Sequence, residues 1–259
     1  MKQPIYEIEL KAIHCNIELW FNGILIYSHY EENGSVWLDW PINHFILSSG
    51  IQNFEVRMIP YSNEKNLSNK VQLELGVHYS DKNDDLDKTE VIERKSIEIP
   101  SPESLPIYIH KEVFSAQVPY ELEGWKNSVD LSEEKKENIL NELLNWKTKI
   151  LSILKESNLK EYNSVFKRRE SEFDKANYSP YFENTMDVFH SKFRDLIDTP
   201  NDIYELQFYA KNKVVSLKMP KKLPGFTFNP KTETEESLGV SLILFFHRPQ
   251  KGLPLEIVK

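Results

Sequence analysis

The sequence predicts an α+β protein of two domains: an antiparallel β-sandwich over residues 1–120, and a domain over residues 131–259 in which helices pack on an antiparallel sheet. The first observation is the distribution of proline and glycine, which interrupt regular structure. No proline lies between Pro119 and Pro180, and no glycine lies between Gly124 and Gly225. On both sides of this stretch, short runs alternate apolar and polar residues, which is typical of strands. Inside it, apolar residues recur at helical spacing.

Short alternating runs fill the first 120 residues. Tyr6, Ile8 and Leu10 alternate with charged residues, which predicts a strand with one buried face. Asn22-Gly23 lies between two apolar runs and predicts a two-residue hairpin turn, because both residues tolerate the positive φ that this turn requires. Strands at this spacing without intervening helices favour an antiparallel sandwich. Further strands are predicted over residues 36–40, 54–59, 71–79, 91–99 and 107–118.

Two segments of this half carry a resemblance to a known family. Residues 19–24 read Leu-Trp-Phe-Asn-Gly-Ile, and residues 45–56 contain Leu47, Gly50 and Asn53 in the order Leu-x-x-Gly-x-x-Asn before a strand. This pattern resembles the galactose-binding-like jelly-roll domains, in which an Asn-Gly hairpin precedes such a segment. The motif covers about 40 residues and the implied fold covers residues 1–120. The resemblance implies an architecture and no ligand.

The central stretch predicts three helices. Ser132 is the expected N-cap of the first, whose apolar stripe runs over residues 139–154. Ser157-Asn158 is expected to end it, and a second helix follows from Leu159. The third is expected within residues 180–200, between two prolines.

The chain then returns to strands. Lys211-Asn212-Lys213 is an expected turn between two alternating runs. Residues 240–246 are apolar on both faces, which predicts a single central strand covered on both sides. Further strands are expected around residues 226–228 and 255–257. This order of elements, over residues 131–259, is similar to the cone-shaped nuclear-transport-factor-like fold, in which a curved sheet wraps a long helix.

Composition and charge narrow the classes of function. No apolar run approaches the roughly 18 residues that span a bilayer, and the start has no block typical of a signal peptide, so a cytoplasmic protein without membrane contact is expected. The net charge is −8, and residues 1–120 hold 10 Lys and Arg against 18 Asp and Glu. This excess disfavours nucleic acid and favours a basic protein partner. None of the seven histidines forms an i, i+4 pair, so no metal or other cofactor is expected.

Candidate binding residues come from the aromatic side chains. Trp37 and Trp40 flank Asp39 with opposite strand parity, so at least one indole is expected to pack in the core. Trp20 lies beside the predicted hairpin, and Tyr61 follows a strand. Aromatic groups of this kind anchor protein partners or stack on sugars.

The histidines supply candidate polar groups. His190 and His247 are the candidates for a pocket in the second half. His78 and His110 lie on the polar side of strands, where exposure is expected. No set of residues matches a catalytic signature.

The sequence therefore favours a non-enzymatic protein-binding module, of the bacterial immunity or adaptor type, that occludes a partner through an acidic surface bearing aromatic residues. Two alternatives stay open. One is a carbohydrate-binding module that uses the exposed aromatics. The other is a small-molecule binder or enzyme with a pocket in the C-terminal half.

Overall fold

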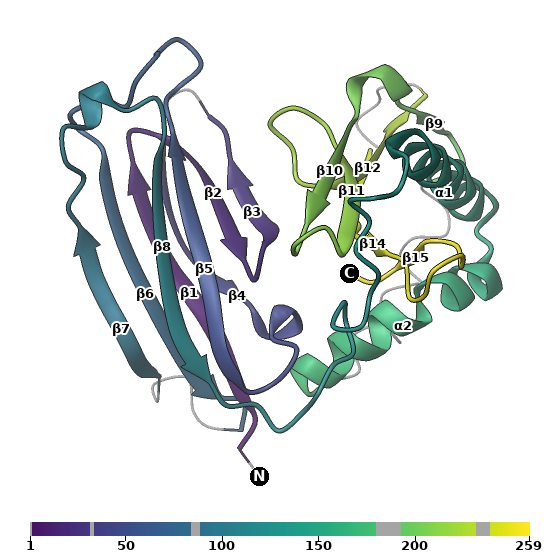
Figure 1. Ribbon diagram of the computed structural model, residues 1–259, viewed down its shortest axis with the longest axis horizontal. Helices are drawn as coiled ribbons and strands as arrows, with labels where there is room; N and C mark the ends of the chain where they lie inside the picture. The colour runs from purple at the N-terminus through teal and green to yellow at the C-terminus, as the bar shows by residue number, and fades with distance from the viewer. Residues whose placement is uncertain (1, 32–33, 84–88, 180–192, 232–238) are drawn as a thin grey trace. The chain divides into compact units, whose positions relative to one another are not determined.

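The chain divides into two compact units (Figure 1). The first comprises Met1–Leu122 and Ala176–Tyr178, and the second comprises Glu123–Lys175 and Ser179–Lys259. The computed structural model describes residues 2–31, 34–83, 89–179, 193–231 and 239–259. The division after Leu122 falls in the segment between the two domains expected from the sequence. Residues 176–178 belong to the first unit, whereas the sequence predicts them in the second domain.

The first unit contains two antiparallel sheets of four strands each. One sheet has the order β4-β1-β6-β7, formed by Ser35–Pro41, Pro4–Ile13, Gln72–Asp81 and Glu90–Ile97. The other has the order β3-β2-β5-β8, formed by Ile24–His29, Asn16–Phe21, Gly50–Ile59 and Tyr108–Ala116. All the strands predicted for this half are present, with their ends moved by a few residues.

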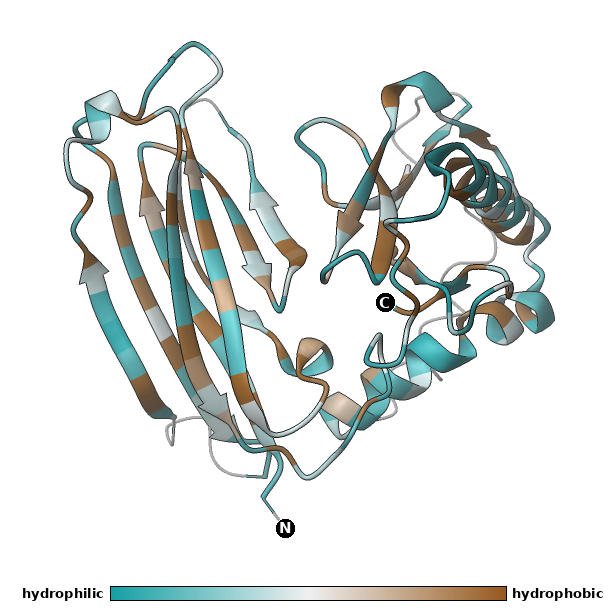
Figure 2. Ribbon diagram, viewed as in Figure 1, coloured by the Kyte–Doolittle hydropathy of each residue, from teal (hydrophilic) through white to brown (hydrophobic). Residues whose placement is uncertain are grey.

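Alternation along the strands builds the core of this unit. Figure 2 shows hydrophobic and hydrophilic residues alternating along its long strands. In β1 the even-numbered residues are buried from Pro4 to Ala12, while the odd-numbered ones are partly exposed. Side chains from the two sheets meet in the interior, where the ring centroids of Tyr6 in β1 and Phe114 in β8 are 6.0 Å apart. The predicted β-sandwich is confirmed.

The predicted hairpin joins β2 and β3. Asn22 and Gly23 both have positive φ, 48° and 78°, as this turn requires. The Asn22 amide donates to the carbonyl of Phe45 and to Oε1 of Gln52, at 3.2 and 2.8 Å. The turn is therefore fixed by local backbone preference and by side-chain bonds to the following segment.

A fully buried amide holds the segment η1 (Asn43–Phe45) to the first unit. Oδ1 of Asn43 accepts a hydrogen bond from the backbone N–H of Tyr6 at 2.6 Å. Its Nδ2 donates to the carbonyls of Pro4 and Ala176, at 2.7 and 3.0 Å. One side chain therefore binds three backbone groups, two in β1 and one at Ala176.

The second unit begins with two helices, α1 (Lys136–Glu156) and α2 (Leu159–Asn177). The expected N-cap at Ser132 is wrong: α1 begins four residues later, because residues 131–134 form a turn closed by a bond from the Glu134 N–H to the carbonyl of Leu131. The predicted break is confirmed. Ser157 adopts the left-handed conformation that ends α1, and Oδ1 of Asn158 accepts from the Glu161 N–H at the start of α2. Most of the third expected helix lies outside the described residues, and the expectation is wrong over its last part, where residues 196–198 form a strand.

Two antiparallel sheets complete the second unit. One has the order β10-β11-β14-β15, formed by Glu205–Tyr209, Val214–Lys218, Phe246–His247 and Glu256–Ile257. The other has the order β13-β12-β9, formed by Val240–Ile243, Gly225–Pro230 and Leu196–Asp198. The expected turn at residues 211–213 joins β10 to β11.

The single central strand expected over residues 240–246 is wrong. This segment divides into β13, at the edge of one sheet, and β14, inside the other. Leu244 and Phe245 connect them and are both buried. The run is apolar on both faces because it contributes to two sheets in succession, and not because one sheet is covered on both sides.

The helices pack on these strands around one apolar core. Leu143 and Ile150 of α1 and Phe166 of α2 belong to the same buried cluster as Val215 of β11 and Phe226 of β12. The predicted class, α+β with helices packed on antiparallel sheet, is therefore confirmed. Across the described ranges, no helix has both the length and the apolar character needed to cross a membrane.

Candidate functional site

Trp37 and Trp40 point to opposite faces of the sheet β4-β1-β6-β7. Trp40 pairs with Ile8, which is fully buried, so its indole faces the interior and packs on Tyr27, with ring centroids 4.9 Å apart. Trp37 pairs with Lys11 on the outer face and is 76% exposed. The prediction that at least one indole packs in the core is confirmed. The two rings cannot form one flat stacking platform.

Trp20 lies on the outer face of the other sheet, where it belongs to a network of polar bonds. Its indole N–H donates to Oε2 of Glu18 at 3.0 Å, and the guanidinium of Arg57 lies 4.1 Å from the ring centroid. The hydroxyl of Tyr30 donates to the other oxygen of Glu18 at 2.6 Å. This arrangement satisfies the buried carboxylate of Glu18 and covers one face of the indole.

Tyr61 stabilises the start of β4. Its hydroxyl donates to the carbonyl of Gly34 at 3.0 Å and accepts from the N–H of the same residue at 3.2 Å. The phenol thus binds backbone of its own unit through both of its hydrogen-bonding capacities.

Of the two candidate pocket histidines, His190 lies outside the described residues. His247, in β14, is buried: it is 2% exposed, and its Nδ1 lies 2.6 Å from Oγ of Ser128. Nε2 has no hydrogen-bond partner among the described residues. Burial, assisted by the charge of Arg168, lowers the pKa of this imidazole to about 4, so it is neutral at neutral pH.

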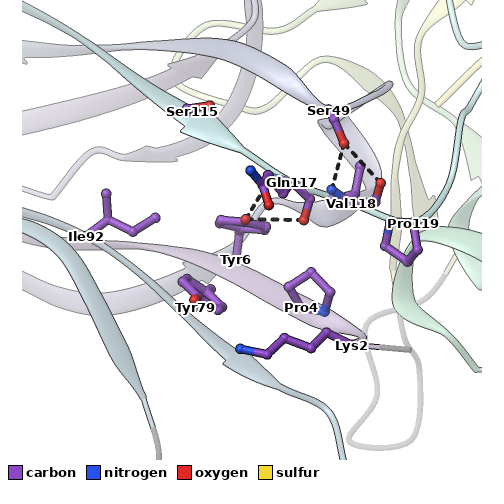
Figure 3. A pocket seen from close by; sticks show the side chains of 10 residues that line it. All are labelled: Lys2, Pro4, Tyr6, Ser49, Tyr79, Ile92, Ser115, Gln117, Val118 and Pro119. Atoms are coloured by element: carbon purple, nitrogen blue, oxygen red, sulfur yellow. Dashed lines mark hydrogen bonds between the residues drawn. The ribbon is translucent and has the colours of Figure 1, made fainter.

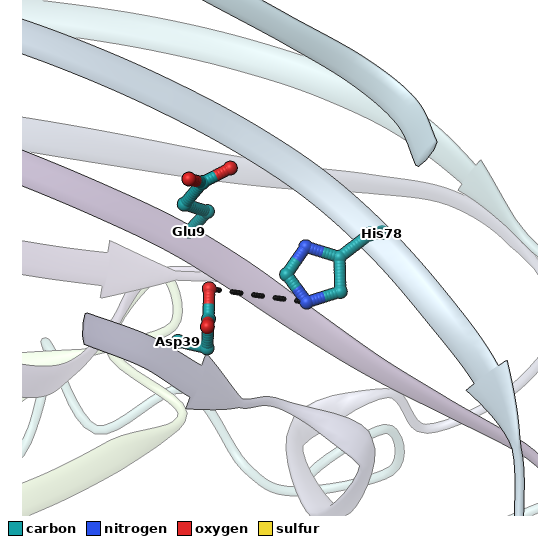
Figure 4. A group of neighbouring side chains, drawn as sticks. All are labelled: Glu9, Asp39 and His78. Carbon is teal, nitrogen blue, oxygen red and sulfur yellow. Dashed lines mark ion pairs between the residues drawn. The ribbon is translucent and has the colours of Figure 1, made fainter. Parts of the chain in front are cut away.

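The outer face of β4, β1 and β6 brings together four ionisable side chains, from which sequence reasoning selected only Asp39. In β1, Glu9 pairs with Asp39 of β4 and with Gly76 of β6, and Glu7 pairs with His78 of β6. Nε2 of His78 lies 3.2 Å from Oε2 of Glu7. The same nitrogen lies 3.9 Å from Oδ1 of Asp39 (Figure 4). The expected exposure of His78 is wrong, since only 7% of it is exposed.

Cations neutralise part of this face. Nζ of Lys11 lies 2.7 Å from Oε1 of Glu74, and Nη2 of Arg94 lies 2.6 Å from Oε2 of Glu9. Glu7 and Asp39 pair with His78 alone within the part of the chain that the structure describes. We call the set Glu7, Glu9, Trp37, Asp39 and His78 the acidic face.

A cleft of about 700 Å³ also lies in the first unit, between residues of β1, β6, β7 and β8 and the segment after β8 (Figure 3). The rings of Tyr6 and Tyr79 contribute to its wall, with centroids 5.3 Å apart. The hydroxyl of Tyr6 accepts from the N–H of Gln117 at 2.8 Å, and Oγ of Ser49 accepts from the N–H of Val118 at 2.9 Å. Its lining side chains include no imidazole, thiol or carboxylate. The complete lining is Lys2, Pro4, Tyr6, Ser49, Tyr79, Ile92, Ser115, Gln117, Val118 and Pro119.

Comparison with known protein families, with curated proteins and with solved structures finds no match. The resemblances to jelly-roll domains and to the cone fold therefore stay predictions. The sequence did not predict the acidic face, because its members lie on three strands and no short motif indicates how these strands pair. The available signal was the polar side of each strand, which contains Glu7, Glu9, Asp39 and His78.

Proposed function

We propose that this chain is a non-enzymatic protein-binding module, of the bacterial immunity or adaptor type, that docks a basic partner on the acidic face. The exposure of Trp37 carries the proposal. It is the most exposed of the large apolar side chains in the described part of the chain, and it lies on the same sheet face as Asp39, Glu9 and Glu7.

Two physical effects support binding at this face. Burial of an exposed indole at an interface supplies a large share of binding energy, and alanine substitution of such an anchor typically costs 2 kcal/mol or more. Carboxylates beside it attract a basic partner and raise the rate of encounter, an effect that salt weakens. Glu7 and Asp39, whose only ion-pair partner among the described residues is His78, supply this negative potential.

The test uses the intact chain. Immobilised protein is incubated with lysate of its source organism at low salt, and a stoichiometric partner is identified by mass spectrometry and purified. Its affinity is then measured for the wild type, for Trp37→Ala and for Ile51→Ala. Ile51 is the matched control because it is 72% exposed on the outer face of the other sheet.

We expect Trp37→Ala to weaken binding by about 30-fold, which corresponds to about 2 kcal/mol. Ile51→Ala should change it by less than about threefold, and the association rate should fall as salt rises. The proposal fails if no stoichiometric partner is recovered, or if the two variants lose affinity equally.

A further inference from the structure

Three strands place potential metal ligands around one point of the acidic face. The atoms of Glu9, Asp39 and His78 that can bind a metal all lie within 4.8 Å of one another. They come from β1, β4 and β6, which pair side by side in one sheet, so their Cα positions are fixed by backbone hydrogen bonds. Figure 4 shows the three side chains on the same side of these strands.

A missing side chain leaves room at this point. Gly76 of β6 pairs directly with Glu9, and a Cβ at Gly76 would lie 2.7 Å from Oε2 of Glu9. Any other residue would therefore displace the carboxylate of Glu9. Glycine weakens a strand interior, and it is typical of positions where another group approaches the backbone closely. Here that group is the carboxylate of Glu9.

The charges at this point leave a deficit of cations. Glu7 and Asp39 approach the single imidazole of His78, which is more than nine-tenths buried. Both nitrogens of Arg94 that contact Glu9 reach the same oxygen, Oε2. No described residue binds Oε1 of Glu9, so this oxygen is available to a cation while Arg94 keeps its contact.

We propose that Glu9, Asp39 and His78 form a binding site for one divalent transition-metal ion, with Zn²⁺ as the best-suited ion. Imidazole nitrogen combined with carboxylate oxygen suits Zn²⁺, whereas Mg²⁺ and Ca²⁺ prefer oxygen alone. Glu7, whose Oε2 lies 3.2 Å from Nε2 of His78, is placed to supply a fourth ligand. The proposal depends on the geometry of this sheet alone and not on the capture of a protein partner.

The distances allow the site to close. Bonds of about 2.1 Å to a tetrahedral Zn²⁺ place the ligand atoms about 3.4 Å apart. The present separations, up to 4.8 Å, must therefore shrink by about 1.4 Å at most. The side chain of Asp39 is 53% exposed, so it can rotate towards the other two ligands without displacing the strands.

The test is isothermal titration of the untagged full chain with ZnCl₂ and, separately, with MgCl₂. We expect one Zn²⁺ per chain, and binding at least about tenfold weaker in His78→Ala and in Asp39→Asn. MgCl₂ should give no comparable binding. The Asp39→Asn variant alters an exposed side chain, so it decides the outcome if His78→Ala does not fold.

His110→Ala is the matched control. His110 also lies on a strand beside a carboxylate, with Nε2 at 2.5 Å from Oε1 of Glu112, but the ammonium of Lys95 already pairs with that carboxylate. This control should bind Zn²⁺ like the wild type. The proposal is overturned if the wild type takes up no Zn²⁺, or if it binds Mg²⁺ and Zn²⁺ with equal affinity. It is also overturned if His78→Ala and Asp39→Asn bind Zn²⁺ as tightly as His110→Ala.

Discussion

Acidification should destabilise the second unit through His247, before most carboxylates are protonated. In the folded chain, burial and, to a smaller extent, the positive charge of Arg168 lower the pKa of His247 to about 4, although the charge of Glu172 opposes them. The ordinary pKa of this group is 6.5. Between these two values the unfolded chain binds a proton that the folded chain does not, so stability falls as the pH falls from 6.5 towards 4.

The size of this effect follows from the two pKa values. Each pKa unit corresponds to about 1.4 kcal/mol, so the full loss across the window is about 3 kcal/mol. About 2 kcal/mol of this should be lost by pH 5. His247 is almost completely buried, and its Nδ1 is already bonded to Ser128, so solvent screens this effect only slightly.

The assay is urea unfolding followed by circular dichroism at pH 7.5, 6.5, 5.5 and 5.0. His247→Gln removes the titrating group and keeps an amide that can bond Ser128. Between pH 7.5 and 5.0, the free energy of unfolding of this variant should fall by about 2 kcal/mol less than that of the wild type. His14→Asn is the control, because His14 is exposed with φ of 59°, a conformation that Asn tolerates. If the free energy of unfolding changes equally with pH in the wild type and in His247→Gln, the reasoning is refuted.

Two further substitutions test packing and buried polarity, each by urea unfolding at pH 7.5. Gly225→Ala should cost about 3 kcal/mol or more, because φ is +139° and the new Cβ would lie 1.9 Å from the carbonyl oxygen of Leu242. Gly252→Ala, with φ of +84° and no atom within 4 Å of the new Cβ, should cost about 1 kcal/mol, and an equal cost at both sites would contradict this account. Asn43→Ala should cost about 3 kcal/mol, because it removes three buried hydrogen bonds to backbone groups. Asn66→Ala, which removes one exposed bond, should cost less than about 1 kcal/mol, and a similar loss for both asparagines would count against the role of Asn43.

Features that depend on neighbouring residues could be predicted from the sequence. The Asn22-Gly23 turn and the break at Ser157-Asn158 were located correctly, because each follows from the backbone preferences of two or three adjacent residues. The opposite directions of Trp37 and Trp40 also follow from local geometry, since successive side chains of a strand alternate between faces.

Features that depend on distant pairing could not be predicted. Residues 240–246 look like one central strand, because an edge strand of one sheet followed at once by an inner strand of another has the same apolar pattern as a single strand covered on both faces. Lys147 lies in a helix whose pattern gives no sign of a buried cation, yet it is fully buried in α1. Its ammonium donates to the carbonyl of Thr199 at 2.6 Å and to Oδ1 of Asn201 at 2.8 Å. Its partners lie more than fifty residues away in the sequence, where no helical periodicity can indicate them.

The acidic face depends both on the local alternation along each strand and on the long-range pairing of the strands. Parity along each strand already places Glu9, Asp39 and His78 on polar sides, but it leaves open which strands are neighbours. A shift of β6 by two residues along β1 would keep every side chain on its face and yet move His78 away from Glu7, opposite Glu9 or Ile5. The local pattern therefore fixes which groups face outward, and the long-range register alone decides whether they surround one ion or lie apart as ordinary surface charges.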